Sequence, residues 1–232
     1  MSLSARDLAR LIDVSAVQAS HGEKEIRQMV RAAKENHFVA VHVLPCWVPF
    51  LKEQLADAPD VMIGAPVGFP AGGHRTEIKV SEAQLLVRDG VQEMDMMLNV
   101  GKLRSGDVAY CEREIREVVA AAAPVPVKVI IEAHYLDERQ VRQACDACIA
   151  GGAAFVKTAT GWAPSGATLE VVRLITSHVG DRIKVKAAGG VRDLDTVVEM
   201  LRLGVSRFGI NLKNSVDLVK AVAALPGGCL DV

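Results

Sequence analysis

The segment "AAFVKTATGWAPSGATLEVVRLITSHVGDRIKVKAAGG", residues 153–190, carries the pattern that decides the fold. A short apolar run leads into Lys157, an amphipathic stretch covers Leu169–Val179, and a second apolar run leads into Lys186. This order of periodicities predicts a strand, a helix and a second strand. Two strands joined by a crossover helix usually lie parallel in one sheet, so the segment predicts a βαβ unit.

The same alternation repeats about eight times along the 232 residues. Runs typical of strands begin at Arg10, Phe38, Val61, Val91, Val125, Ala153, Arg182 and Ser206. Helical patterns cover Glu23–Glu35, Thr76–Arg88, Val108–Ala122, Glu138–Ala150, Leu169–Val179 and Leu194–Leu203, with weaker ones near Pro49–Ala56 and Ser215–Ala224. Eight such units predict an α/β fold, a (β/α)8 TIM barrel that forms a single domain over residues 1–232. A doubly wound open sheet is the alternative, but the chain has no G-x-G-x-x-G sequence.

The composition is typical of a globular protein, with 50% hydrophobic and 24% charged residues. The formal net charge of −1 gives no electrostatic reason to expect a nucleic-acid or acidic-membrane partner. Apolar runs stay below the roughly 18 residues of a membrane span. Five cysteines, an odd number spread along the chain, do not suggest a disulfide framework. We therefore expect a cytoplasmic protein with neither nucleic acid nor membrane as a partner.

Active sites of this barrel lie at the carboxyl ends of the strands. Polar residues at the predicted strand ends are Asp13, Ser15, His42, Asp95, Asn99, Glu132, His134, Lys157, Thr158, Lys186 and Asn211. Lys157 and Lys186 are the most informative, because they end neighbouring strands. Lys184 and Lys186 are two residues apart, so both should face the barrel interior.

Two lysines inside a barrel should favour the neutral amine, because burial and a nearby like charge both lower a lysine pKa. Such an amine is a nucleophile suited to Schiff-base chemistry with a carbonyl compound. The alternative is that both side chains reach water. Asp95, within "EMDMMLN", is expected to be buried and to need a cationic partner. It could shuttle protons during carbon–carbon bond cleavage, or it could be a structural ion pair.

The last two predicted strands are followed by features that favour phosphate binding. "AAGGVRD", residues 187–193, leads into a helix, and "FGIN", residues 208–211, ends the last strand. Backbone amides at Gly189 and Gly190 could approach an anion closely, with charge added by Arg192 or Lys213.

A metal site is the less favoured interpretation. His42, Glu132 and His134 lie at strand ends and could in principle bind a divalent ion. The chain has no His-x-His or H-E-x-x-H spacing, so we predict no metal. "CDAC", which holds Cys145 and Cys148, has no second C-x-x-C and is interpreted as buried thiols.

Several longer motifs resemble those of the deoxyribose-phosphate aldolase family, whose members are class I aldolases on a (β/α)8 barrel. The resemblance covers nearly the whole chain. It is carried by "LIDVSAV", "VGFPAGGHRTEIKVSEA", "EMDMMLNVGKLRSGD", "VKVIIEAHYL", "FVKTATGWAPSGAT", "VKAAGGVRD" and "SRFGIN". The K-T-x-T-G block at Lys157 is the most specific of these, since barrel architecture alone does not require it.

The resemblance implies a role for each matching residue. Lys157 corresponds to the Schiff-base lysine, Lys186 to the lysine that lowers its pKa, and Asp95 to the aspartate that relays protons through a water. Substrate-binding positions are Asp13, Ser15, Thr158, Gly161, Gly189, Gly190, Gly209 and Asn211. The implied reaction, part of deoxyribonucleotide and carbohydrate catabolism, is reversible cleavage of 2-deoxy-D-ribose 5-phosphate to D-glyceraldehyde 3-phosphate and acetaldehyde. It needs no cofactor, and members are commonly homodimers or homotetramers.

The chain departs from the family pattern at a few positions. Asn211 and Leu212 stand where serines usually help to hold the phosphate, and His42 stands where many members have a cysteine. His134 replaces a small or thiol residue, and the chain has no tyrosine at its carboxyl end. A Schiff-base aldolase for a related sugar or sugar phosphate therefore remains an alternative, as do a metal-dependent or isomerase barrel and a ligand-binding barrel without activity.

Overall fold

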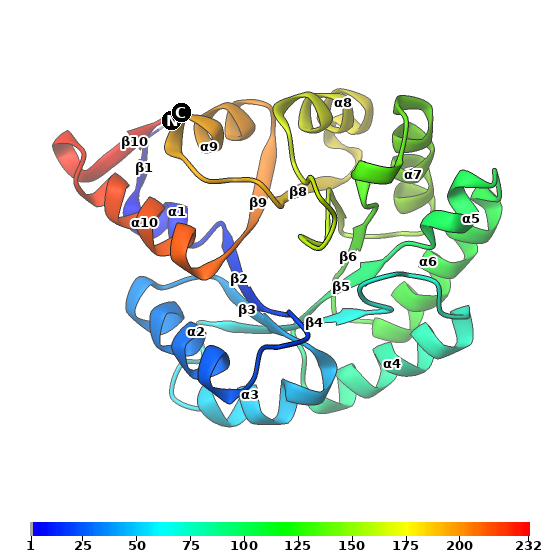
Figure 1. The fold of residues 1–232 in the computed structure, drawn as a ribbon, viewed down its shortest axis with the longest axis horizontal. Coiled ribbons are helices and arrows are strands. Elements are labelled where there is room, and N and C mark those ends of the chain that lie inside the picture. Colours follow the sequence, from blue (N-terminus) through cyan, green and yellow to red (C-terminus); the bar gives the residue numbers. More distant parts are fainter. Residues whose placement is uncertain (1) are drawn as a thin grey trace.

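A computed structural model describes residues 2–232, and within them eight parallel strands close into one barrel. Figure 1 shows the strands at the centre with helices around them, which confirms the predicted (β/α)8 TIM barrel. The barrel strands are β2 (Ile12–Ala16), β3 (Ala40–Val43), β4 (Met62–Val67), β5 (Glu93–Met97), β6 (Val127–Ile130), β7 (Phe155–Lys157), β8 (Lys184–Ala188) and β9 (Val205–Ile210). Each strand pairs with the next, and β2 pairs with β9 to close the barrel.

The main helices follow the strands as the apolar periodicity predicts. They are α2 (Glu23–Asn36), α3 (Val48–Gln54), α4 (Thr76–Asp89), α6 (Val108–Ala122), α7 (Glu138–Ala150), α8 (Leu169–Val179), α9 (Leu194–Arg202) and α10 (Leu212–Ala223). Side-chain caps begin several of them. The Asp137 carboxylate accepts the Gln140 amide at α7, and the Asp193 carboxylate accepts the Thr196 amide at α9.

Short elements complete the chain. They are β1 (Ser2–Ser4), β10 (Cys229–Asp231), α1 (Ala5–Ala9), α5 (Val100–Arg104) and the 3-10 turns Pro45–Trp47, Ala133–Tyr135, Gly180–Arg182 and Pro226–Gly228. β1 and β10 form a separate antiparallel pair, with Leu3 opposite Leu230. This pairing brings the two ends of the described chain side by side (Figure 1).

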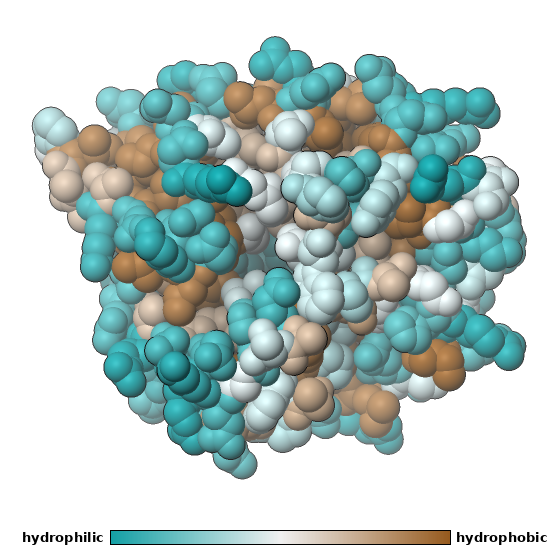
Figure 2. Space-filling model, viewed as in Figure 1, coloured by the Kyte–Doolittle hydropathy of each residue, from teal (hydrophilic) through white to brown (hydrophobic). Residues whose placement is uncertain are grey.

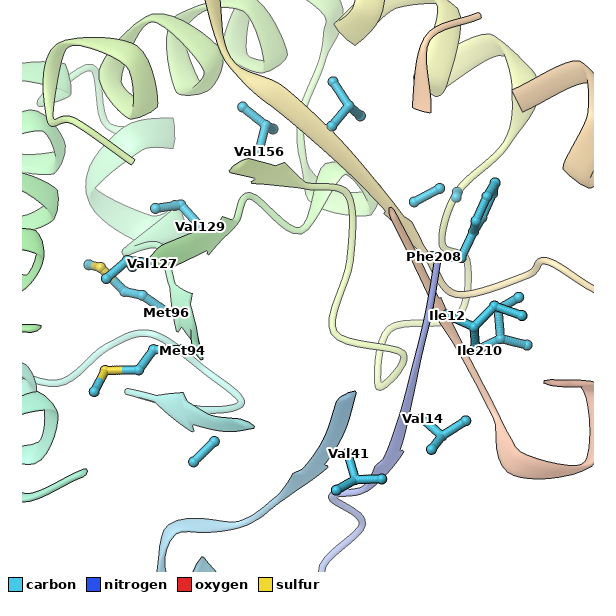
Figure 3. Close-up of a cluster of buried hydrophobic side chains, with 14 of the residues drawn as sticks. Ile12, Val14, Val41, Met94, Met96, Val127, Val129, Val156, Phe208 and Ile210 are labelled. Atoms are coloured by element: carbon cyan, nitrogen blue, oxygen red, sulfur yellow. The ribbon is translucent and has the colours of Figure 1, made fainter. Parts of the chain in front are cut away.

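The hydrophobic core lies between the barrel and its helices. Outward-facing strand residues such as Val14, Val41, Met94, Met96 and Val156 are almost fully buried there (Figure 3). Because strand side chains alternate, the residues between them face the barrel interior. Around the barrel end in Figure 2, the surface is mainly hydrophilic or neutral. None of the helices in residues 2–232 is long and apolar enough to cross a membrane.

Candidate active site

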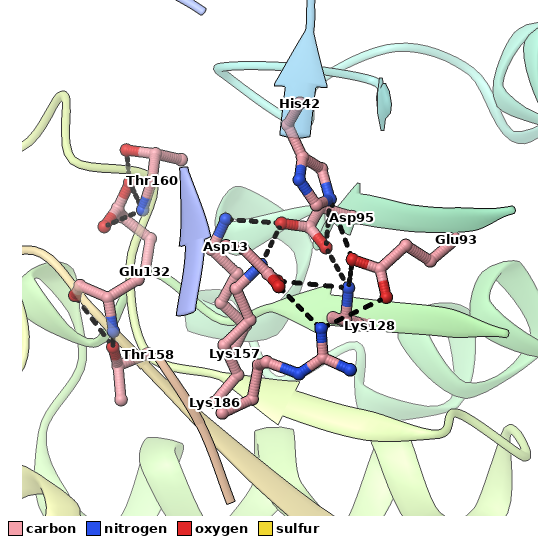
Figure 4. Close-up of polar contacts among 12 residues, drawn as sticks. Asp13, His42, Glu93, Asp95, Lys128, Glu132, Lys157, Thr158, Thr160 and Lys186 are labelled. Atoms are coloured by element: carbon pink, nitrogen blue, oxygen red, sulfur yellow. Dashed lines mark hydrogen bonds and ion pairs between the residues drawn. The ribbon is translucent and has the colours of Figure 1, made fainter. Parts of the chain in front are cut away.

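The inner face of the barrel brings Asp95, Lys157 and Lys186 together, as Figure 4 shows. Lys157 and Lys186 are direct neighbours in the pairing of β7 with β8. Asp95 reaches them from β5, across the barrel. One carboxylate oxygen of Asp95, Oδ2, accepts from Lys157 Nζ at 2.7 Å and from Lys186 Nζ at 2.8 Å. The buried carboxylate therefore has the lysine partners that its sequence context predicts.

The two lysines titrate in opposite directions. Burial, opposed by Asp95 and assisted by Lys186, lowers the pKa of Lys157 from 10.5 to about 8. Burial also acts against the charge of Lys186, but Asp13 and Asp95 outweigh it and raise the Lys186 pKa. Although burial raises the pKa of Asp95, Lys157 and Lys186 bring it well below its usual value. Lys157 is thus the lysine that loses its proton most readily, and burial contributes more to this than the neighbouring charge does.

Lys184 differs from Lys186 although both lie on one face of β8. Its side chain is exposed at the amino end of the strand, where its Nζ lies 5.6 Å from the centre of the Phe155 ring. Only Lys186, two residues further along β8, reaches the buried carboxylates of Asp13 and Asp95.

Four further charged residues, which the sequence analysis did not single out as a cluster, support this trio from below. Asp13 Oδ2 lies 2.6 Å from Lys186 Nζ, and Asp13 Oδ1 accepts from Arg207 at 2.6 Å. Glu93 Oε1 lies 2.5 Å from Lys128 Nζ and Glu93 Oε2 lies 3.6 Å from Arg207. Burial acts against ionisation of Asp13, but Lys128 and Lys186 lower its pKa strongly. Asp13, predicted to bind substrate, therefore holds Lys186 in place through a buried ion pair.

His42 completes the inner cluster from β3. It is 3% exposed, and its Nε2 lies 3.5 Å from both Glu93 Oε1 and Asp95 Oδ1. Neither of its ring nitrogens has a hydrogen-bond partner within residues 2–232. Its ring covers Gly64, where a Cβ atom would lie 2.6 Å from His42 Cε1.

A cavity opens above these charges and continues outward to the glycine-rich loops. Its inner part is lined by Asp13, Ser15, Val17, His42, Pro66, Phe69, Asp95, Ile130, Lys157, Thr160, Lys186 and Gly209. Its outer part is lined by residues that include Ser15, His21, Gly161, Gly189, Gly190, Arg192, Gly209, Asn211 and Asn214. The structure thus brings every predicted substrate-binding residue to the cavity except Thr158. The Thr158 hydroxyl instead bridges to β8, where it donates to the Ala188 carbonyl and accepts the Ala188 amide, both at 2.9 Å.

The outer part of the cavity ends at the first turn of α10. Asn211 is the N-cap of this helix, and its side-chain oxygen accepts the Asn214 amide at 2.9 Å. One helix-terminal amide is therefore already satisfied by the protein itself. Gly189 and Gly190 both have positive φ, which turns the loop after β8 sharply beside the cavity.

Glu132 has a structural contact that the sequence did not indicate. It adopts a left-handed conformation with φ +47°, which is uncommon for a residue with a side chain. Its carboxylate accepts the Thr160 amide at 3.2 Å and also the Thr160 hydroxyl. Glu132 therefore clamps the loop that follows Lys157. The other strand-end candidates lie apart from the trio, since His134 contacts Ser165 at 2.6 Å and Asn99 caps α5.

A metal ion fits poorly at the carboxylates of the site. Ligand atoms of Asp13, His42 and Glu93 lie within 4.8 Å of one another. However, Lys128 and Lys186 already lie within ion-pair distance of these two carboxylates. Glu132 and His134, predicted as possible ligands, are hydrogen-bonded to Thr160 and Ser165 instead.

The cysteines are all free, and Cys145 and Cys148 are buried thiols as expected.

Known proteins share both the sequence and the architecture of this chain. A family model described as DeoC/LacD family aldolase matches residues 4–209. A deoxyribose-phosphate aldolase of Sinorhizobium medicae is 52% identical over 231 residues, which cover 100% of this chain and 93% of that protein. A solved structure named QR15, an aldolase, superposes with a TM-score of 0.86 at 38% identity, covering 93% of this chain and 95% of its own. The deoxyribose phosphate aldolase of Aeropyrum pernix, described as a unique tetramer, gives a TM-score of 0.84 at 28% identity, with 96% and 94% covered.

Proposed function

The chain belongs to the DeoC/LacD family of aldolases, and on this premise we propose that it cleaves 2-deoxy-D-ribose 5-phosphate reversibly through a Schiff base on Lys157. The products are D-glyceraldehyde 3-phosphate and acetaldehyde. The observation that carries the proposal is a buried lysine in the cavity whose pKa is lowered to about 8. Relative to an ordinary lysine, this raises the fraction of free amine near neutral pH by about 300-fold.

The steps follow from the positions of the three residues. The Lys157 amine attacks C1 of the open-chain sugar, and loss of water gives an iminium ion. Removal of the C3 hydroxyl proton breaks the C2–C3 bond, and the bonding electrons pass to the iminium to form an enamine. Asp95, within hydrogen-bond distance of Lys157 Nζ, is suited to relay these protons. Protonation of the enamine at C2 and hydrolysis then release acetaldehyde and restore the amine.

Lys186 acts on Lys157 rather than on the sugar. It shares Asp95 Oδ2 with Lys157, so it weakens the hold of that carboxylate on the Lys157 proton. It stays charged through the reaction because Asp13 and Asp95 stabilise its ammonium form. A permanent cation at this distance favours the neutral amine of Lys157.

The outer part of the cavity accounts for the phosphate group. Gly161, Gly189, Gly190 and Gly209 line it without a side chain in the way of an anion, and Arg192 supplies a positive charge. Ser15 lines both parts of the cavity and is placed to contact the sugar between them. Asn211 and Asn214 stand at the far end and offer side-chain amides where the family usually has hydroxyls.

We extend the proposal to the assembly and location of the protein. We propose that residues 1–232 act as one barrel domain, of which Met1 lies outside the described residues. A homodimer or homotetramer is supported by Ile78 and Leu85 of α4, which are 55% and 51% exposed on one helix face. Five free cysteines are consistent with the reducing cytoplasm. Light scattering after size exclusion measures the assembly, and a monomer at micromolar concentration would contradict this part.

Borohydride reduction in the presence of acetaldehyde tests the chemistry. We expect a two-carbon adduct on Lys157 in peptide mass spectrometry, and no adduct at this position in Lys157→Leu. Cleavage of 2-deoxyribose 5-phosphate should be lost in that variant. An active Lys157→Leu enzyme, or an activity that a chelator abolishes, would favour a metal-dependent or isomerase barrel instead.

A further inference from the structure

His42 is a buried imidazole at the inner end of the cavity that holds Lys157. The proposed steps do not use it. Its ring lies on the cavity wall, yet both ring nitrogens are shielded from solvent and unpartnered within the described residues. An unpartnered buried polar group is costly, so its retention in this position calls for a function.

The surroundings of His42 determine which role it can fill. Its Nε2 is 3.5 Å from a Glu93 oxygen and equally far from Asp95 Oδ1, the oxygen of Asp95 that the two lysines do not use. A nitrogen lone pair facing two carboxylate oxygens would be repelled, so the proton of a neutral ring belongs on Nε2. The imidazole is therefore a donor aimed at two carboxylates on neighbouring inward positions of β5.

Charged groups from several strands surround the ring. The charged groups that face the cluster are Asp13 from β2, Glu93 and Asp95 from β5, Lys128 from β6, Lys157 from β7, Lys186 from β8 and Arg207 from β9. Strand β4 has no charged residue. Three carboxylates are opposed by three cations when Lys157 is an amine.

From this geometry, and resting on the proposed Schiff-base function, we propose that His42 is a positioning residue that acts through Asp95. Its Nε2–H shares the negative charge of Asp95 Oδ1, which fixes the carboxylate beneath the lysines and limits how strongly Oδ2 holds the Lys157 proton. The ring nitrogens of His42 are buried, so they act on the site through Asp95 rather than on the substrate.

The test compares two unbranched substitutions of similar length, His42→Met and His42→Gln. Gln keeps an N–H donor near the position of Nε2, whereas Met keeps the volume over Gly64 without a donor. We measure kcat and KM for cleavage of 2-deoxyribose 5-phosphate from below to above the Lys157 pKa of about 8. Thermal unfolding of each variant and borohydride trapping on Lys157 with acetaldehyde accompany the kinetics.

We expect His42→Met to lower kcat by about tenfold with little change in KM, because Asp95 Oδ1 loses the polar N–H that faces it at 3.5 Å. The acidic limb of its pH–activity profile, where activity falls as Lys157 gains a proton, should move upward by up to about one pH unit, because Asp95 then holds the Lys157 proton more tightly. His42→Gln should restore both values to within about twofold of the original enzyme.

Two results would overturn the inference. One is a His42→Met enzyme with an unchanged pH profile and kcat. The other is equal impairment of both variants together with a lowered Tm, which would show that the ring matters only for packing over Gly64. Failure of the unsubstituted protein to form a Lys157 adduct would instead refute the Schiff-base function itself, so the two failures are distinguishable.

Discussion

Replacing Lys186 by methionine should move the acidic limb of the pH profile upward. Lys186 and Lys157 both donate to Asp95 Oδ2, at 2.8 Å and 2.7 Å. Without Lys186, Asp95 stabilises the Lys157 ammonium alone, and a like charge disappears from its neighbourhood. Both changes raise the Lys157 pKa, because they favour its protonated form.

The size of the movement is bounded by the structure. The Lys157 pKa lies at about 8, against 10.5 for an unburied lysine. Burial is the largest cause of the lowering and remains in the variant. We therefore expect a rise of about one unit, equivalent to about 1.4 kcal/mol. Near neutral pH this removes about nine-tenths of the remaining amine, so activity should fall about tenfold and recover in part at alkaline pH.

The assay follows acetaldehyde release from 2-deoxyribose 5-phosphate with alcohol dehydrogenase and NADH across the pH range. Lys184→Met is the matched control, because Lys184 lies on the same face of β8 but is exposed at its amino end. It should leave the limb in place. A Lys186→Met limb that stays at about 8, or moves to lower pH, would refute the reasoning.

Three other changes test the supporting structure. Glu132→Gln should raise KM about tenfold without shifting the acidic side of the pH–activity profile, because it loosens only the loop after β7. Steady-state kinetics across the pH range check this, and a shifted profile would contradict it. Lys79→Met should destabilise the fold by about 3–5 kcal/mol in urea, because it leaves Glu114 unpaired at 0% exposure, and adding Glu114→Gln should restore part of the loss. The pKa values of Asp13 and Asp95 are lowered in the folded state. Their contribution to stability is therefore present above the unfolded pKa of about 3.9 and is lost as the pH falls below that value. Acid unfolding monitored by circular dichroism should show this loss, and stability that rises below that pH would contradict it.

The barrel and the meeting of Asp95 with Lys157 and Lys186 were predictable because both depend on local periodicity. The helices Val108–Ala122 and Leu169–Val179 have the bounds that their apolar pattern predicts. Lysines at the ends of consecutive strands in a parallel barrel had to be neighbours, and the pairing of Lys157 with Lys186 confirms this. The antiparallel contact of β1 with β10 was not predictable, because two three-residue strands more than 220 positions apart carry no local signal.

The contacts of the charged residues that surround the trio could not be predicted from sequence patterns alone. Glu93 and Asp95 are two residues apart, so the sequence could have placed both on the inner face of β5. Lys128 meets them from the neighbouring strand β6, where it is paired with Asp95, whereas Arg207 reaches Glu93 from β9, so its contact depends on how the barrel closes across its interior. Likewise, the Thr158 hydroxyl hydrogen-bonds to Ala188 instead of facing the cavity, and this depends on the register of β7 against β8.

The contact of His42 with Gly64 has an evolutionary consequence. A Cβ atom at position 64 would overlap the His42 imidazole, with the ring Cε1 at 2.6 Å and two other ring atoms closer still, so no side chain at this position fits while the ring keeps its place. A smaller residue at position 42 would remove the three atoms that lie nearest to such a Cβ, all of which belong to the His42 ring. The effects of the two positions are therefore expected to be non-additive, with Gly64→Ala harmful beside His42 and tolerated better beside a small residue. A lineage that acquired the imidazole could not later lose the glycine without first giving up the ring.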